Sequence, residues 1–354
     1  MNNPDWESGD KMGESVVSET LGRKIGLGIL YFLMAAGAVC LLVLVQTVAV
    51  LGVGILGLVL GYDPNAFLNA YDGTATFVYG VLAIPSLLLY LKLIRRKGEP
   101  MFMNEKLNTA QIVFVLVCTF GISGIVTIYL VSASLIAQKF VTVANEIDKY
   151  SEAVNRYSAI EAVNIPKIDH ILNFLGTCIL APITEELTFR AGVLHTLLKR
   201  FRPAVAVILS ALAFGVLHIR SIQIGYALIA GFFLGWIYYY TKSIRSVIIM
   251  HILFNMFGSG ITTFLQSGMF GDMSKTVENI NGYTFLVEFS LIIPGIICFI
   301  FLRSMYKNSV RIDTGAKPAI ALDPADSVED FVPDENAPSP FAPITSPSGD
   351  NSDE

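Results

Sequence analysis

Long apolar stretches separated by short polar segments dominate the chain from about residue 25 to residue 304. A run of about 20 mainly apolar residues is long enough to cross a bilayer as a helix. The pattern therefore predicts an all-α, polytopic membrane protein with about eight transmembrane helices. The apolar runs lie at 26–60, 74–94, 110–137, 171–198, 204–220, 222–241, 245–266 and 284–303.

The positive charges predict the orientation. Eight crossings place both termini on one side, and the segments that share that side carry most of the 24 lysines and arginines. Because basic residues concentrate on the cytoplasmic side, we expect both termini to be cytoplasmic in a multi-pass protein of the cell membrane. The first apolar run begins near Ile25 and exceeds the apolar core of a signal peptide, so we interpret it as a retained helix.

The composition supports this class. Of the residues, 53% are hydrophobic and only 15% are charged, whereas soluble domains carry about 25% charged residues. The cysteines Cys40, Cys118, Cys178 and Cys298 lie far apart, so neither a zinc knuckle nor a disulfide framework is indicated. The basic cluster at 95–97 flanks a predicted span and is interpreted as a topology anchor, so we expect no nucleic-acid partner.

Five regions follow from these patterns. Residues 1–24 form a polar cytoplasmic N-terminus, and 25–137 form three N-terminal transmembrane helices. Apolar residues in 138–169 are spaced like one face of a helix, which predicts an extracytoplasmic amphipathic loop. Residues 170–304 form a membrane core, and the acidic, proline-rich segment 313–354 is expected to be a disordered cytoplasmic tail whose partner is unknown.

Three ionisable residues, Glu185, Glu186 and Arg190, lie inside the fourth apolar run. A charge at the centre of a membrane helix costs at least ~2.5–3.5 kcal/mol, so such residues usually mark a functional site. Glu186 and Arg190 are four residues apart and can pair along one helix face, which leaves Glu185 to act on water as a general base. Adjacent side chains diverge by about 100°, so both glutamates can face one ligand only if the helix is distorted, which Pro182 could cause.

Two later runs add His218, near the end of the fifth, and His251 with Asn255, one turn apart in the seventh. Glu185, His218 and His251 could hold zinc and its water, or these residues and Asn255 could position a water and stabilise an oxyanion without metal. The spacing leaves both chemistries open, and each leads to amide hydrolysis. One difficulty is depth: at ~1.5 Å per residue, Glu185 and His218 lie roughly 20 Å from their cytoplasmic helix ends, but His251 lies only about 9 Å from its own.

The ordered pattern resembles the CPBP family of membrane proteases, which includes the type II CAAX prenyl endopeptidases and abortive-infection and bacteriocin-immunity relatives. The motifs are Glu185-Glu186-x-x-x-Arg190, Phe214-x-x-x-His218 and His251-x-x-x-Asn255. The resemblance covers about residues 170–265, so it reaches neither the first three helices nor the tail. It implies that 170–304 is a catalytic core. It further implies catalytic roles for Glu185, His218, His251 and Asn255, and a structural or supporting role for Glu186 and Arg190.

We therefore expect an intramembrane endopeptidase that acts on a peptide or a membrane-associated protein, prenylated or not. The alternatives are a non-catalytic membrane scaffold or sensor, or a bacteriocin-immunity-type protein. A transporter that uses Glu185 as a proton relay would require an inverted repeat between the two halves. The polar residues are confined to the second half, which argues against a transporter.

Overall fold

The computed structural model describes residues 21–155 and 165–313, and in this part all regular elements are helices, which confirms the all-α prediction. The chain divides into two units, Met1–Asn308 and Ser309–Glu354. The predictions for the polar N-terminus and the acidic tail fall almost wholly outside the described residues.

The first helices are α1 (Leu21–Val59), α2 (Pro64–Ala70), α3 (Asp72–Ile94), α4 (Thr109–Ala137) and α5 (Val141–Asn155). The next are α6 (Lys167–Leu175), α7 (Ala181–Glu186), α8 (His195–Leu197), α9 (Pro203–Val216) and α10 (Ser221–Thr241). The last are α11 (Ile244–Asn255), α12 (Ile261–Leu265) and α13 (Ser274–Asp313).

Six helical stretches in the described residues are long and apolar enough to cross a membrane, so the chain is a multi-pass membrane protein. They are α1, α3, α4, α10, the run from α11 to α12, and α13. The helix α9 is shorter, with 14 residues. The predicted fourth span is divided by π-helical segments into α6, α7 and α8. The number of eight crossings and the cytoplasmic placement of both termini stay predictions.

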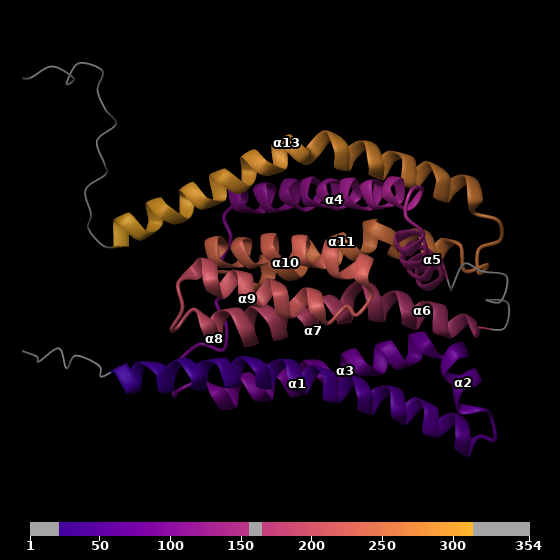
Figure 1. Cartoon of the computed structure of the whole chain (residues 1–354), viewed down its shortest axis with the longest axis horizontal. Coiled ribbons are helices and arrows are strands. Elements are labelled where there is room, and N and C mark those ends of the chain that lie inside the picture. The colour runs from indigo at the N-terminus through magenta and orange to yellow at the C-terminus, as the bar shows by residue number, and fades with distance from the viewer. Residues whose placement is uncertain (1–20, 156–164, 314–354) are drawn as a thin grey trace, which may run out of the picture. The chain divides into compact units, whose positions relative to one another are not determined.

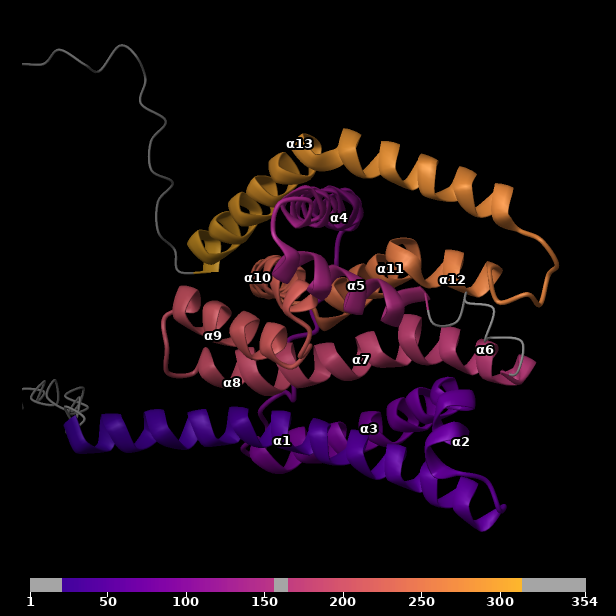
Figure 2. The same ribbon diagram turned by 45° about the vertical axis from the view of Figure 1, so that its right-hand side comes forward.

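The helices that carry the candidate site lie in the middle of this bundle (Figures 1 and 2). Helix α1 packs along α3, and both contact the broken helix that contains α7. On the other side of α7, α10 packs against α9, and α11 packs against α4. Helix α13 follows α4 on the side that faces away from α7. The site helices therefore have protein neighbours on both sides.

The turn between α10 and α11 lies beneath the segment 95–108. Ser243 is fully buried and forms an isolated antiparallel bridge with Asn104, and the backbone N–H of Ile244 donates to the carbonyl of Met103 at 2.9 Å. Helix α11 thus begins below a covering segment rather than at the end of the bundle. A count of residues from the start of α11 therefore leaves out the segment that covers it.

Arg95 holds the covering segment in place. It belongs to the basic cluster interpreted as a topology anchor, which stays a prediction, but only 8% of the residue is exposed. Its guanidinium donates hydrogen bonds to the carbonyl of Ala191 at 2.6 Å, the hydroxyl of Thr196 at 3.0 Å and the carbonyl of Met101 at 3.2 Å. A buried cation that satisfies three acceptors joins the end of α3 to the broken helix.

The predicted amphipathic helix is present as α5, in the part of the loop that the structure describes. Its side chain Glu146 accepts a hydrogen bond from the hydroxyl of Ser221, the first residue of α10, at 2.6 Å. Hydrogen bonds from Lys149 and Ser221 hold the pKa of Glu146 below its ordinary value. An ionised carboxylate therefore ties α5 to the start of α10 at neutral pH.

Helices α4 and α13 approach each other at two glycines. A Cβ atom on Gly124 would lie 2.6 Å from the carbonyl oxygen of Glu288, and one on Gly121 would lie 2.5 Å from that of Leu291. Small residues permit such close backbone contact between membrane helices, which gains van der Waals energy where no hydrophobic force drives association. The contact fixes the backbone of α13 against α4 at the level of these residues.

We predict that Gly124→Ala lowers the stability of the protein by about 1–3 kcal/mol, because the new methyl group meets backbone that cannot rotate away. The matched control is Gly52→Ala in α1, where nothing lies within 4 Å of the added Cβ. Thermal unfolding of the two purified variants in one detergent measures the difference. Equal melting temperatures for both variants would contradict the close contact.

Candidate active site

The helix that carries both glutamates is distorted on either side of them. Helix α7 is preceded by the π-helical segment η2 (Gly176–Leu180) and followed by η3 (Leu187–Leu194). Such wide turns are rare and occur often at functional sites, because they change which way the neighbouring side chains point. The predicted distortion is present. Pro182 lies in the first turn of α7, directly after the π-helical segment η2.

Glu186 and Arg190 form the predicted pair within the protein interior. Both side chains are completely buried, and Nε of Arg190 lies 3.0 Å from Oε2 of Glu186. The guanidinium carbon also lies 5.0 Å from the ring centroid of Phe214, a distance at which an aromatic face attracts a cation. The pair therefore places a charged carboxylate at a position that water does not reach.

His251 contacts both glutamates, one with each ring nitrogen. Its Nδ1 lies 2.8 Å from Oε1 of Glu186, and its Nε2 lies 3.6 Å from Oε2 of Glu185. Since a carboxylate can only accept, Nδ1 carries a hydrogen and Nε2 is the nitrogen left to face other groups. The spacing along the helix predicted only the pair of Glu186 with Arg190, so the contact of Glu186 with His251 was not expected.

His218 lies outside the helix in which it was expected. Helix α9 ends at Val216, and His218 follows in a turn, just before Ile219, which has a φ of 63°. The helix therefore ends earlier than the hydrophobic run suggests. Nδ1 of His218 donates to the carbonyl of Phe214 at 2.9 Å, and the two rings pack edge to face with centroids 4.8 Å apart.

Phe214, the aromatic residue four positions before His218, contacts several residues of the site. Its ring lies 5.8 Å from that of His251 and 5.0 Å from that of Phe189, in addition to its contacts with His218 and Arg190. One aromatic ring therefore packs against the buried arginine and against both imidazoles.

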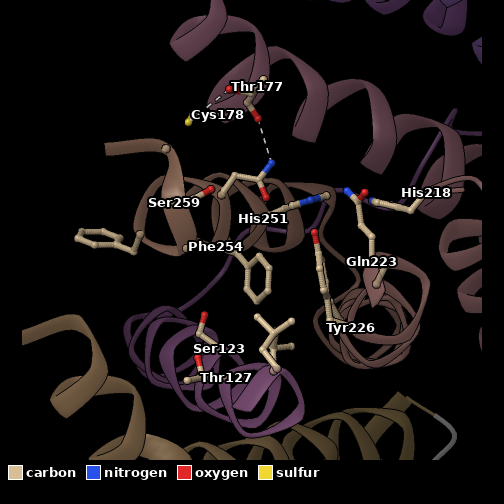
Figure 3. A pocket seen from close by; sticks show the side chains of 18 of the residues that line it. Ser123, Thr127, Thr177, Cys178, His218, Gln223, Tyr226, His251, Phe254 and Ser259 are labelled. Atoms are coloured by element: carbon tan, nitrogen blue, oxygen red, sulfur yellow. Dashed lines mark hydrogen bonds between the residues drawn. The ribbon is translucent and has the colours of Figure 1, made fainter. Parts of the chain in front are cut away.

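Asn255 lies beside η2, and a hydrogen bond holds its side chain there. Its Nδ2 donates to the carbonyl of Thr177 at 2.9 Å, as Figure 3 shows. The two segments approach closely near this bond, because a Cβ on Gly260 would lie 2.2 Å from Sγ of Cys178. The amide has a second N–H and a carbonyl oxygen that remain available to a ligand.

The four predicted catalytic residues, Glu185, His218, His251 and Asn255, line one cavity of about 540 Å³. Glu185 is 23% exposed at its side chain, whereas Glu186 is 0% exposed. The side chain of Glu185 therefore reaches the cavity, and that of Glu186 does not. Among the helices that contribute to its wall are α4, α7, α10, α11 and α13.

Several polar residues of this wall were missed by the sequence analysis. Gln223 and Tyr226 of α10 line the cavity, and Figure 3 shows the hydroxyl of Tyr226 and the amide of Gln223 pointing toward the space beside His251 and His218. Their spacing of three residues on an otherwise apolar helix is a signal that could have found them. Glu288 of α13 was also missed, although a carboxylate inside an apolar run is the same signal that revealed Glu185.

The expected metal ligands do not gather as a set. Glu185 and His251 are neighbours, but in the described residues no group of three or more histidine, cysteine, aspartate or glutamate side chains is arranged to hold a metal ion. Zinc sites in enzymes take three protein ligands and a water. Among the described residues, the side chains as placed therefore do not supply the three ligands that such a zinc site needs.

We predict that Arg190→Met destabilises the protein by about 3–5 kcal/mol, because it leaves the carboxylate of Glu186 buried without its cation. The matched control is Lys149→Met, which removes the exposed partner of Glu146 and should cost about 1 kcal/mol or less. Denaturant or thermal unfolding in detergent measures both. Adding Glu186→Gln to Arg190→Met should recover part of the loss, and no recovery would contradict the buried-charge explanation.

Comparison with known proteins identifies the segment that holds these residues. Residues 167–257 match the family model described as Type II CAAX prenyl endopeptidase Rce1-like. Comparisons with curated proteins and with solved structures gave no match. The family match includes every residue from Glu185 to Asn255 and excludes α1 to α5 and α13. The resemblance to CPBP membrane proteases is thereby confirmed, over a segment that corresponds to the type II CAAX prenyl endopeptidases.

Proposed function

We propose that this protein is an intramembrane endopeptidase in which Glu185 activates a water molecule. The observation that carries the proposal is the convergence of Glu185 from α7, His218 from the turn after α9, and His251 and Asn255 from α11 on one cavity. The match of residues 167–257 to a family of CAAX-type membrane proteases supports protease activity in general. The assignment of roles to single residues is our own inference from their geometry.

The position of the water follows from one distance. Oε2 of Glu185 and Nε2 of His251 are 3.6 Å apart, which is too long for a good direct hydrogen bond. The separation allows one water molecule to contact both atoms, as bridging waters commonly do. In this arrangement Nε2 of His251 accepts a hydrogen bond from one O–H of the water and holds it in place, while the carboxylate of Glu185 accepts the other O–H and takes that proton.

The buried pair serves the orientation of His251. Glu186 fixes the ring through Nδ1, and Arg190 keeps Glu186 ionised and in place. A carboxylate that accepts from one imidazole nitrogen determines which tautomer is present and where the other nitrogen points. Glu186 and Arg190 are therefore positioning residues, and neither touches the substrate.

The reaction then takes two proton transfers. The oxygen of the water bonds to the carbonyl carbon of the scissile amide as its proton passes to Glu185. The carbon–nitrogen bond breaks as Glu185 returns this proton to the leaving nitrogen, giving a new carboxyl and a new amine. The free N–H of Asn255 and the hydroxyl of Tyr226 line the same cavity and are the candidate donors for the oxyanion. His218 gives its Nδ1 hydrogen to Phe214, so its Nε2 faces the cavity as an acceptor that can position the substrate.

The substrate is an extended peptide segment that reaches a cavity enclosed by membrane helices. A cavity of about 540 Å³ accommodates a few residues of such a segment. Because the matched family is described as CAAX prenyl endopeptidases, a prenylated C-terminal peptide is the first substrate to test, beside the same peptide without the lipid. A non-catalytic scaffold remains the rival function, and it requires no cleavage by the wild-type protein.

We predict that Glu185→Gln lowers kcat/KM by about 10²–10⁴-fold, because the amide cannot accept the proton of the water. The control is Glu278→Gln, an exposed position on α13 outside the cavity, which should keep wild-type activity. Mass spectrometry of prenylated and unprenylated peptides incubated with the purified proteins in nanodiscs gives the rates. Cleavage by Glu185→Gln at the wild-type rate would contradict the proposal.

We further predict that Tyr226→Phe lowers kcat by about tenfold or more with little change in KM. The reason is that a donor to an oxyanion acts in the transition state and contributes little to substrate binding. The same peptide assay separates the two constants. A raised KM with an unchanged kcat would show instead that Tyr226 only contacts the substrate.

A further inference from the structure

Glu288 is a second membrane carboxylate on the wall of the catalytic cavity. It belongs to α13, which lies outside the segment matched by the protease family. The residue is 5% exposed and lines the same cavity as Glu185 and His251. Nothing in the proposed hydrolysis uses it, so its presence calls for a separate explanation.

The contacts of Glu288 in the described residues include no cationic partner. Thr127 of α4 donates to its Oε2 at 2.7 Å, and among the described residues this hydroxyl is its one hydrogen-bond partner. No lysine, arginine or histidine in the described part of the chain forms an ion pair with it. Buried carboxylates are ordinarily paired, because burying a lone charge is costly.

The packing of α4 against α13 does not explain why residue 288 is a glutamate. Gly121, Gly124 and Gly295 bring the backbones of α4 and α13 together, and this close approach does not require the carboxylate. The sulfhydryl of Cys118 donates to the carbonyl of Gly295 at 3.3 Å in the same contact. A glutamine would accept the hydrogen bond of Thr127 equally well at a smaller desolvation penalty, so the charge itself is the feature to explain.

The surroundings of Glu288 match a particular kind of side chain. Val126, Leu130 and Phe285 contribute apolar surface to the cavity, with Ser123 and Thr127 as neighbours on α4. Figure 3 shows Ser123 and Thr127 on α4, across the cavity from His251 and Thr177. Lysine and arginine have an apolar stem and a cationic end, and they bury the stem along apolar surface while the charge reaches a polar partner.

We propose that Glu288 forms a specificity subsite that binds a basic side chain of the peptide substrate. The proposal rests on the proposed endopeptidase function. The stem of a substrate lysine or arginine lies along the apolar wall, and its cationic group pairs with the oxygen of Glu288 that Thr127 does not occupy. The rigid contact of α4 with α13 holds the carboxylate at a constant place in the cavity, so the subsite selects one position of the peptide.

The test is a lysine scan in a neutral host peptide. Peptides with a single lysine at successive positions are compared with peptides that carry norleucine, the uncharged analogue, at the same positions. Wild-type protein should prefer lysine at one position by about tenfold or more in kcat/KM, mainly through KM. Glu288→Gln should reduce this lysine-to-norleucine ratio to near one, because it keeps the acceptor for Thr127 and removes the charge.

Thr127→Val is the matched control. It removes the hydrogen bond between α4 and α13 and keeps the charge, so the lysine-to-norleucine ratio should stay well above one. If Glu288 were only a helix contact, Glu288→Gln and Thr127→Val would change both peptides alike and leave the ratio at its wild-type value. That result, or a wild-type ratio near one at every position, overturns the subsite.

A binding measurement separates this inference from the proposed function. Fluorescent lysine and norleucine peptides are titrated onto Glu185→Gln protein and onto Glu185→Gln/Glu288→Gln protein in nanodiscs. Preferential binding of the lysine peptide that is lost in the double variant supports the subsite even if no peptide is cleaved. Equal binding of both peptides to both proteins contradicts it, whatever the activity of the wild type.

Discussion

A buried carboxylate held between a guanidinium and an imidazole is the interaction on which the site depends. Glu186 lies 3.0 Å from Arg190 on its own helix and 2.8 Å from His251 on α11. Within a low-dielectric interior, such a group is stable only when every partner is in place. Glu186 therefore links the broken helix to α11. Its contact with His251 satisfies part of the buried carboxylate and also orients the imidazole toward Glu185.

Two backbone features allow this contact. Glu185 and Glu186 both reach one imidazole, and the helix that carries them is π-helical on either side of α7. The covering segment 95–108, held by the buried Arg95, places the first turn of α11 within the bundle. His251 therefore meets the glutamates at depth although it lies only seven residues after the start of its helix.

The cavity that results has two carboxylates in different settings. Glu185 lies beside an imidazole and is partly exposed, which suits proton transfer to and from water. Glu288 lies on a wall formed by α4 and α13 with one hydroxyl as its partner, which suits recognition of a cation. The helices outside residues 167–257 thus add a distinct element to the cavity.

The sequence by itself determined the all-α membrane class, the paired spacing of Glu186 with Arg190 and the four residues expected to share a site, because these follow from apolar run length and from periodicity within one helix. It also contained the signal of Glu288, which was overlooked. Only the tertiary structure decided that His251 contacts both glutamates, that α9 ends before His218 and that Arg95 is buried. These depend on how separate helices pack and where their turns lie, and spacing along one helix carries no information about distances between helices.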